Sequence, residues 1–367
     1  MQTPKISKLA IICQHPVQYY APLFQLMAQQ QDIKVFYAPK ATGNKFDEGF
    51  GHTINWDIPV LQGYEHLFSH RLKDINDYCP TAILIYGWAY TSHMKIILHF
   101  SKRITVLFRG DSTILDPISP WRSILKSYLL RKVYTRIDFA LYVGSNNKAY
   151  FEHYGLKSKQ LIYARHAVDN TRFAANRQLE AVKLRTSLGI ANTEVLVLFA
   201  GKLIPKKRPE MLLKAFGSLT PPGAHLLFVG NGILEDTLKK NALALPNQAC
   251  IHFLSFQNQQ RMPVIYQSCD LFCMPSTGPG ESWGLAINEA MAAGKAILSS
   301  DKVGGAADLI DDNNGRIFTS GDLRDLTNKL QIMLASKRTL EHMGQASSER
   351  IKYWNFQHQI DAIYGIS

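Results

Sequence analysis

The residues best suited to chemistry lie at positions 275–294, in the segment PSTGPGESWGLAINEAMAAG. A loop rich in glycine and proline follows an expected strand here, and we expect a helix to begin near Gly284. Amide groups at the start of a helix bind phosphate, helped by the helix dipole. Glu281 in the loop and Glu289 in the helix could accept hydrogen bonds from ligand hydroxyls. The alternative is that Glu281 only complements the dipole and that Glu289 faces solvent.

A second segment, FAGKLIPKKR at positions 199–208, gathers positive charge. It places Lys202, Lys206, Lys207 and Arg208 directly after an expected strand. Ligands of open parallel sheets bind at the carboxyl ends of the strands, so these cations would lie where a ligand binds. They could neutralise a diphosphate leaving group. The alternative is a run of charges that only contacts solvent.

The elements that must position these segments follow from the hydrophobic pattern. Short apolar runs alternate with longer amphipathic stretches, which predicts a doubly wound parallel sheet in each half of the chain. The expected strands are 9–13, 34–37, 82–85, 104–108 and 139–143 in the first half, and 194–200, 225–229, 250–254, 270–274 and 296–299 in the second. The clearest expected helices are 19–30, 121–134, 208–217 and 234–244.

The length of 367 residues exceeds that of one ordinary core and predicts two domains. We expect a first domain over residues 1–175 and a second over 190–350. Two such open α/β domains would face each other across a cleft, and ligands would bind at the carboxyl ends of their strands.

Composition narrows the class of protein. No apolar run approaches the roughly 18–20 residues that span a bilayer, and the N-terminal run is typical of a first strand rather than a signal peptide, so we expect a cytoplasmic protein. The five cysteines form no C-x2-C pair that would hold zinc. The net charge of +12 lies mostly in residues 1–180 and suggests an anionic partner: a lipid surface, a phosphorylated acceptor or nucleic acid.

The motifs together resemble the retaining glycosyltransferases of family 4, which have the GT-B architecture. The resemblance covers the second half of the chain. It rests on five motifs in the family's order. The first three are AGKL at 200–203 with the segment through Lys207, FVGNG at 228–232 and DLFCMPS at 270–276. The other two are Glu281 to Glu289, with Trp283 and Gly284 between them, and VGG at 303–305 with Asp308 and Asn314-Gly315. The family usually has arginine at position 202 and glycine at position 208.

The resemblance implies a role for each motif. Lys202 and Lys207 would hold the diphosphate of a nucleotide-sugar donor, Glu281 the sugar hydroxyls and Glu289 the ribose. Ser282, Trp283, Gly284 and Leu285, with Gly230 and Asn231, would complete the donor site. Glu281, Lys202 and Lys207 would act in catalysis.

The resemblance also implies a mechanism and an arrangement of domains. Such enzymes retain the anomeric configuration without an established nucleophile, and the leaving phosphate helps to deprotonate the acceptor. No cofactor or metal is expected, and the chain has no Asp-x-Asp pair. Two doubly wound Rossmann-like domains would face each other across a cleft: residues 1–175 on the acceptor side and 190–350 for the donor. Residues 351–367 would form a helix crossing back to the first domain.

Three residues of the first half are candidates for the acceptor side. His15 follows the first strand, in the sequence CQHPVQYY, and could face the acceptor or the donor; a structural role in the turn is the alternative. Arg109 and Asp111 follow a later strand, in FRGDS, where many relatives place a histidine. The resemblance implies a glycan or lipid-linked acceptor, in bacterial surface polysaccharide or lipopolysaccharide assembly.

The expected helix at 121–136, WRSILKSYLLRKVYTR, is apolar and carries five basic residues. It could lie on an anionic membrane at the inner face of the plasma membrane. The favoured alternative is a helix packed on the sheet with a solvated basic edge.

Other functions fit the sequence less well. A nucleotide-sugar epimerase or phosphorylase of related two-domain shape, or a non-catalytic nucleotide-sugar-binding protein, remains an alternative. An oxidoreductase is disfavoured because no G-x-G-x-x-G follows the first strand. Binding of nucleic acid is supported only by the net charge, so we expect none.

Overall fold

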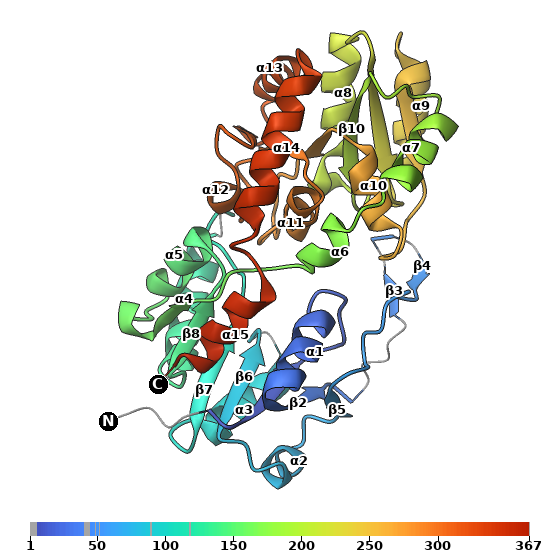
Figure 1. Cartoon of the computed structure of the whole chain (residues 1–367). Coiled ribbons are helices and arrows are strands. Elements are labelled where there is room, and N and C mark those ends of the chain that lie inside the picture. The colour runs from blue at the N-terminus through green and yellow to red at the C-terminus, as the bar shows by residue number, and fades with distance from the viewer. Residues whose placement is uncertain are drawn as a thin grey trace. The chain divides into compact units, whose positions relative to one another are not determined.

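The computed structural model describes residues 6–39, 45–47, 49–50, 52–88, 90–116 and 119–366. The interpretation of the N-terminus as something other than a signal peptide depends partly on residues 1–5, which lie outside the described residues. The chain separates into two compact units (Figure 1). Unit 1 comprises Met1–Asn44, Ile58–Ala167 and Asn355–Ser367, and unit 2 comprises Lys45–Asp57 and Val168–Trp354.

Unit 1 is built on a seven-stranded parallel sheet in the order β5-β2-β1-β6-β7-β8-β9. Its strands are β1 (Lys8–Cys13), β2 (Asp32–Tyr37), β5 (Glu65–Phe68), β6 (Ala82–Tyr86), β7 (Thr105–Arg109), β8 (Phe139–Tyr142) and β9 (Leu161–Tyr163). Its helices are α1 (Ala21–Gln30), α2 (Leu72–Asp77), α3 (Thr91–Phe100), α4 (Pro120–Tyr134), α5 (Ser145–His153) and α15 (Phe356–Tyr364), with a short 3-10 turn at Ser158–Gln160.

Both faces of the unit 1 sheet are covered, which explains why its central strands are continuous apolar runs. Along β1, Leu9 and Ile11 belong to one buried cluster, and Ala10 and Ile12 belong to another. Because side chains alternate along a strand, these clusters lie on opposite faces of the sheet. α1 and α15 lie side by side over the first cluster (Figure 1), and α3, α4 and α5 contribute to the second.

Unit 2 contains a six-stranded parallel sheet in the order β12-β11-β10-β13-β14-β15. The strands are β10 (Val195–Ala200), β11 (Ala224–Val229), β12 (Ile251–Leu254), β13 (Leu271–Met274), β14 (Ala296–Ser300) and β15 (Gly315–Phe318). The helices are α6 (Asn170–Ala174), α7 (Gln178–Ser187), α8 (Pro209–Leu219), α9 (Glu235–Leu243), α10 (Met262–Ser268), α11 (Leu285–Ala292), α12 (Ala306–Leu309), α13 (Leu323–Leu334) and α14 (Lys337–Ile351), with 3-10 turns at Pro205–Lys207 and Gln248–Cys250.

A small antiparallel hairpin, β3 (Lys45–Asp47) with β4 (His52–Ile54), also belongs to unit 2 although the chain enters it from unit 1. Its neighbourhood is tied to unit 2 by hydrogen bonds: Asn258 Nδ2 donates to Asn55 O at 2.5 Å, and the amide of Gln260 donates to Asp57. The sequence division had included residues 45–57 in the span 1–175.

The predicted fold class of two doubly wound parallel sheets is confirmed, and each expected strand is present with ends shifted by at most two residues. The strands β5, β9 and β15 and the β3–β4 hairpin were not predicted. They are edge strands or short segments without a continuous apolar run. Within the described part of the chain, no helix has the length and apolar character needed to cross a membrane.

Candidate functional site

In unit 2 the two chemistry-bearing segments lie against each other. The Lys207 ammonium forms an ion pair and hydrogen bond with Glu281, and Ser276 Oγ donates to the same Glu281 oxygen at 3.1 Å. The amide of Thr277 donates to the carbonyl of Lys206 at 3.0 Å, so backbone also joins the two loops. The structure therefore brings Lys207 and Glu281 together, and it adds Ser276, which the sequence marks only as part of the DLFCMPS motif.

The loops after β10 and β11 approach each other closely because of a glycine. Gly230 has φ +134°, and a Cβ at this position would collide with the carbonyl oxygen of Gly201. Asn231 fixes the same corner: its Nδ2 donates to Glu235 at 2.8 Å, and its Oδ1 accepts from the amide of Phe256 at 2.6 Å. The side chain of Asn231 is thus occupied in positioning loops, and only its backbone faces the lysine-bearing segment, where its carbonyl accepts from Leu203.

The start of α11 is held by the segment that follows β14. Trp283 O accepts from the amide of Gly305 at 2.9 Å, and Glu281 O accepts from the amide of Gly304 at 3.0 Å. Gly284 has φ +88° and reverses the chain into the helix whose first residue is Leu285. The amide of Ile287 donates to the carbonyl of Gly284 at 2.8 Å, so Leu285 and Ala286 hold the amides at the start of the helix that are suited to an anion.

Two further members of this loop have structural surroundings. The Trp283 ring is buried, and its Nε1 donates to Asn288 at 2.9 Å. Ser282 lies between Glu281 and Trp283 in the loop that leads to α11. We therefore assign the Trp283 side chain to the packing of α11, and only its backbone remains a candidate for ligand contact.

Glu289 is not a surface residue, so that alternative is wrong. Its side chain is only 3% exposed, and Tyr266 Oη on α10 donates to it at 2.7 Å. Tyr266 was not predicted from the sequence, because a tyrosine in an apolar helix is typical of ordinary core packing. Glu281 and Glu289 thus have different partners, a lysine and a tyrosine.

Lys202 has a partner of its own. Its ammonium lies 2.7 Å from Asp47 on the hairpin and 5.1 Å from the centre of the Phe50 ring. Burial alone would raise the pKa of Asp47, but the hydrogen bond and charge of Lys202, with the amides of Phe50 and Gly49, lower it below its usual value. No local signal marks Asp47, since the contact joins residues 155 positions apart.

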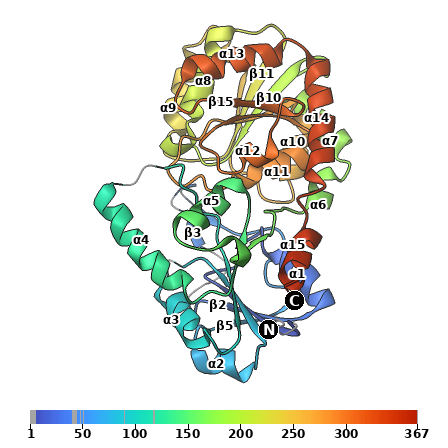
Figure 2. The same cartoon turned by 90° about the vertical axis from the view of Figure 1, so that its left-hand side faces the viewer.

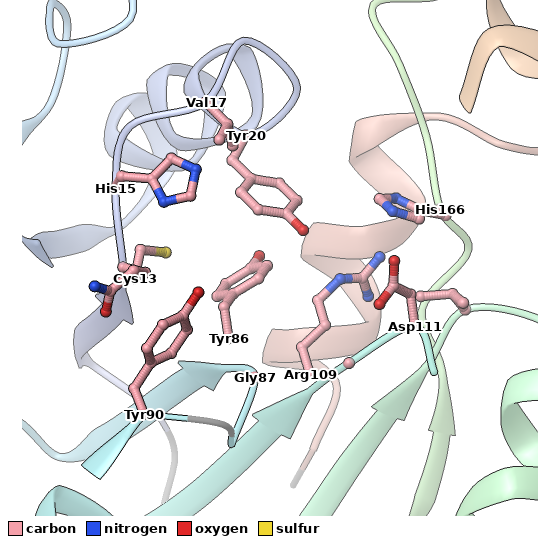
Figure 3. Close-up of a pocket in the computed structure, with 13 residues that line it drawn as sticks. Cys13, His15, Val17, Tyr20, Tyr86, Gly87, Tyr90, Arg109, Asp111 and His166 are labelled. Carbon is pink, nitrogen blue, oxygen red and sulfur yellow. The ribbon is translucent and has the colours of Figure 1, made fainter. Parts of the chain in front are cut away.

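In unit 1, the three acceptor-side candidates line one cavity of about 190 Å³ (Figure 3). His15 comes from the loop after β1, and Arg109 and Asp111 come from the end of β7 and the loop beyond it. Sequence reasoning missed Tyr20, Tyr86, Tyr90 and His166, which complete much of the lining. Such a cavity, walled by aromatic rings and a few polar groups, is typical of small-molecule sites.

The charges of this cavity are set by burial. Arg109 is only 3% exposed, and its Nη1 donates to the carbonyl of Ala164 at 2.8 Å. Burial and, second, the charge of Arg109 hold the pKa of His166 well below its usual value, so His166 is neutral near pH 7. Burial likewise raises the pKa of Tyr20 and of Tyr86, which keeps both phenols protonated.

Among the described residues, no group of three His, Cys, Asp or Glu side chains could hold a metal ion. The expectation that the site works without a metal stays a prediction.

Comparison with known protein families finds a family match for the second half of the chain. Residues 181–350, which contain both loops of the unit 2 site, match the model of the family Glycosyl transferases group 1. These residues form a group 1 glycosyl transferase domain. The Lys207–Glu281 pair, Gly230, Glu289 and the start of α11 all lie within this domain.

Curated relatives match about half of the chain. The chain is 28% identical over 194 residues to sulfoquinovosyl transferase SQD2 of Arabidopsis thaliana, over 52% of this chain and 36% of the relative. It is 28% identical over 184 residues to D-inositol 3-phosphate glycosyltransferase of Mycolicibacterium smegmatis, over 49% of this chain and 41% of the relative. The matches thus span less than half the length of these two relatives.

Solved structures extend the likeness to the whole chain. HepE of Anabaena, solved in complex with UDP and glucose, is similar with a TM-score of 0.72 and 17% identity, over 98% of this chain and 99% of that one. At this identity the similarity shows the fold, which is GT-B with two Rossmann-like domains.

Proposed function

We propose that this chain transfers a sugar from a nucleotide-diphosphate sugar to an acceptor, with retention of the anomeric configuration. One observation carries the proposal: within the glycosyl transferase domain, Lys207 from the loop after β10 pairs with Glu281 in the loop that leads to α11. A cation, a carboxylate and a helix N-terminus are the groups that a diphosphate and sugar hydroxyls require. The UDP bound by HepE supports testing uridine nucleotides first.

In the proposed mechanism the chain acts by positioning and electrostatics. Lys207 and Lys202 neutralise the charge that develops on the diphosphate as it leaves, and the first amides of α11 bind its oxygens. Glu281 accepts hydrogen bonds from sugar hydroxyls and Glu289 from the ribose. The departing phosphate takes the acceptor's proton on the same face of the sugar, so retention needs no protein nucleophile.

The proposal has an acceptor side and a setting. Unit 1, with His15, Arg109 and Asp111, binds a glycan or lipid-linked acceptor. The resemblance stated from the sequence supports a role in bacterial surface polysaccharide or lipopolysaccharide assembly, in the cytoplasm. No metal is part of the proposed mechanism.

Thermal stabilisation by nucleotides tests the donor site. UDP, GDP, ADP and CMP, and the matching nucleotide sugars, are added to the full chain with and without magnesium. A nucleotide at 100 times its dissociation constant should stabilise the protein by about 2.7 kcal/mol. A selective shift identifies the base, whereas the absence of any shift in a folded protein contradicts the proposal.

Two alternatives are separated by product analysis. An epimerase converts the donor sugar without an acceptor, and a non-catalytic binding protein leaves the nucleotide sugar unchanged. A transferase releases nucleoside diphosphate only when an acceptor receives the sugar, and the anomeric proton coupling of the product reports retention.

The proposal includes contact with an anionic membrane through α4, which projects along one side of unit 1 (Figure 2). Trp121, Ile124, Leu125 and Tyr128 follow helical spacing and are exposed, Ile124 by 71%. Arg122, Arg131 and Lys132 are exposed on the same helix, and positions 120–136 contain no acidic residue. An apolar stripe with flanking cations suits the surface of an anionic bilayer. The favoured alternative, a helix packed on the sheet with a solvated basic edge, accounts for the buried Leu130, Val133 and Tyr134 but not for the exposed apolar stripe.

Vesicle flotation tests this contact with the full chain. Binding is expected to vesicles that contain phosphatidylglycerol and not to pure phosphatidylcholine. Lys126 is a poor target because its ammonium lies over the rings of Tyr150 and Tyr154, so charge reversal uses Arg122, Arg131 and Lys132. Reversal of Lys183, Lys214 and Lys240, exposed lysines of unit 2, is the matched control. Binding that both triple variants reduce equally, or no binding at all, contradicts a role for α4.

A further inference from the structure

We propose that the cavity of unit 1 binds a sugar that carries an oxyanion, a phosphate or a carboxylate, and that Arg109 holds this oxyanion. The inference rests on the proposed function in taking this sugar to be part of the acceptor, but the binding itself is measurable without turnover. It names a ligand class that the unit 2 site does not determine.

The state of the Arg109 side chain is the first observation. The side chain is buried, and Nη1 is satisfied by the carbonyl of Ala164 at 2.8 Å. Nη2 is also buried and has no hydrogen-bond partner among the described residues. In Figure 3 the guanidinium points into the cavity. A buried, charged donor without a partner is costly, and an oxyanion of a ligand is its strongest complement.

Two more polar atoms of the cavity lining are also buried without a hydrogen-bond partner among the described residues. These atoms are Tyr86 Oη and Gln14 Oε1. The rings of Tyr20 and Tyr86 pack with their centres 4.7 Å apart, so apolar faces lie beside these polar atoms. A sugar has hydroxyls for the polar atoms and C–H faces for the rings. One small cavity thus gathers three polar atoms whose partners a sugar ligand would supply.

The charges of the lining favour a ligand with its charge at one end. His166 is neutral, so Arg109 supplies fixed positive charge. The carboxylate of Asp111 points into the same cavity (Figure 3). An anion that filled the cavity would meet this carboxylate. A sugar could place its oxyanion at Arg109 and direct neutral hydroxyl groups, rather than a second charge, toward Asp111.

A purely structural role for these residues predicts a different outcome. If Arg109 served only to hold the carbonyl of Ala164, its Nη1 group alone would be sufficient. If Tyr86 served only a structural role, its hydroxyl would be expected to form a hydrogen bond with the protein. Removal of the Tyr86 hydroxyl therefore separates the two roles. It should leave the stability of the ligand-free protein unchanged or higher, because it deletes an unsatisfied buried group, and it should weaken binding of the ligand.

The experiment measures binding to the full chain by isothermal titration in the presence of UDP. The probes are hexose 1-phosphates and 6-phosphates, glucuronate and galacturonate, the neutral parent sugars and inorganic phosphate. We expect at least one anionic sugar to bind about tenfold more tightly than its neutral parent. Preference for the phosphates or for the uronates identifies the oxyanion.

Three variants sharpen the measurement. Arg109→Gln should lower the affinity for the anionic sugar about 10- to 100-fold and change that for the neutral sugar less than about threefold. Tyr86→Phe should lower the affinity about three- to tenfold without lowering the Tm of the ligand-free protein. Arg103→Gln, at an exposed position of unit 1, should change neither.

The result can overturn the proposal in several ways. Equal binding of anionic and neutral sugars, indifference to Arg109→Gln, binding of inorganic phosphate as tight as that of any sugar phosphate, or no binding of any probe would each do so. UDP stabilisation in the same samples reports the unit 2 site separately. Loss of one signal with retention of the other therefore distinguishes failure of this inference from failure of the proposed function.

Discussion

Lys207 and Glu281 form the smallest unit on which the proposed chemistry depends. Both side chains are largely shielded from solvent, and they form an ion pair with each other. A donor diphosphate would compete with Glu281 for Lys207, and the sugar hydroxyls would then occupy Glu281. The pair thus holds the two groups in place before the donor arrives, which reduces the reorganisation that binding requires.

Replacement of Lys207 by alanine should slow transfer about 100-fold, a loss on the order of 3 kcal/mol of transition-state stabilisation, because one cation at the leaving group is removed. The measurement is kcat with a saturating donor. Lys214→Ala, at an exposed lysine of α8 in the same unit, is the control and should retain full activity. A Lys207→Ala enzyme within twofold of wild type would remove this lysine from the mechanism. Glu281→Ala should also lose turnover while it still binds UDP.

The carboxylate of Asp47 is expected to repel the phosphates of the proposed donor. It pairs with Lys202, and its lowered pKa keeps it ionised at neutral pH. Because the pKa is depressed in the folded state, the contribution of this pair to stability is present above the ordinary carboxyl pKa and is lost as the pH falls through the folded value. Near pH 7 the carboxylate is a negative charge beside the phosphate position proposed here.

Asp47→Asn should therefore raise the affinity for UDP about two- to fivefold at low ionic strength, and the gain should shrink in high salt. Titration calorimetry at two salt concentrations measures this. Asp57→Asn serves as the control, because Asp57 is a carboxylate of the same segment that accepts from the amide of Gln260. Weaker binding by Asp47→Asn would instead make Asp47 a residue that positions Lys202.

At the scale of elements, central strands could be predicted and edges could not. β1, β6, β10 and β11 lie between covered faces and are therefore unbroken apolar runs. β5 alternates half-buried and exposed residues, so no such run marks this edge strand.

The candidate site also contains residues that could be predicted from the sequence and residues that could not. Loops that follow central strands, with Lys207 and Glu281, could be located from local sequence. Asp47, Tyr266 and the tyrosine wall of the unit 1 cavity could not, because their contacts connect distant parts of the chain.

The turn into α11 depends on a glycine. Gly284 combines φ +88° with a neighbour so close that a Cβ would lie 2.5 Å from Val303 Cγ1. Gly284→Ala should destabilise unit 2 by about 2 kcal/mol or more and weaken UDP binding, since strain and collision act together.

Gly189→Ala separates these two causes. Gly189 has φ +72°, but nothing lies within 4 Å of the added Cβ, so only backbone strain remains. Its cost should be about 1 kcal/mol, with UDP binding unchanged. Equal loss of stability in the two variants, measured by denaturant unfolding, would show that the contact with Val303 does not matter.

At the scale of the whole molecule, each unit has its own core, and residues that follow unit 2 in the sequence complete the core of unit 1. Ile360, Ile363 and Ile366 belong to the buried cluster that also contains residues of β1 and α1. The long connection through unit 2 therefore separates parts of a single core by nearly the full length of the sequence.

Ile363→Ala should destabilise unit 1 by about 2–5 kcal/mol, the usual cost of truncating a buried aliphatic side chain. Amide hydrogen exchange should accelerate in β1 and β6 and stay unchanged in β10 and β11. Leu330→Ala, a buried truncation in α13, should give the opposite pattern. Acceleration in both sheets for either variant would mean that the two units do not open independently.

The position of α15 also bears on how the protein is made. A ribosome releases the chain from its beginning, so the isoleucines of α15 emerge after the strands that they cover. The face of the sheet in unit 1 that α1 shares with α15 stays incomplete until residues 356–366 have emerged, whereas residues 168–354 can already assemble their own sheet. The inserted unit is therefore expected to fold first, and a stalled or shortened chain would leave a nascent sheet exposed to chaperones.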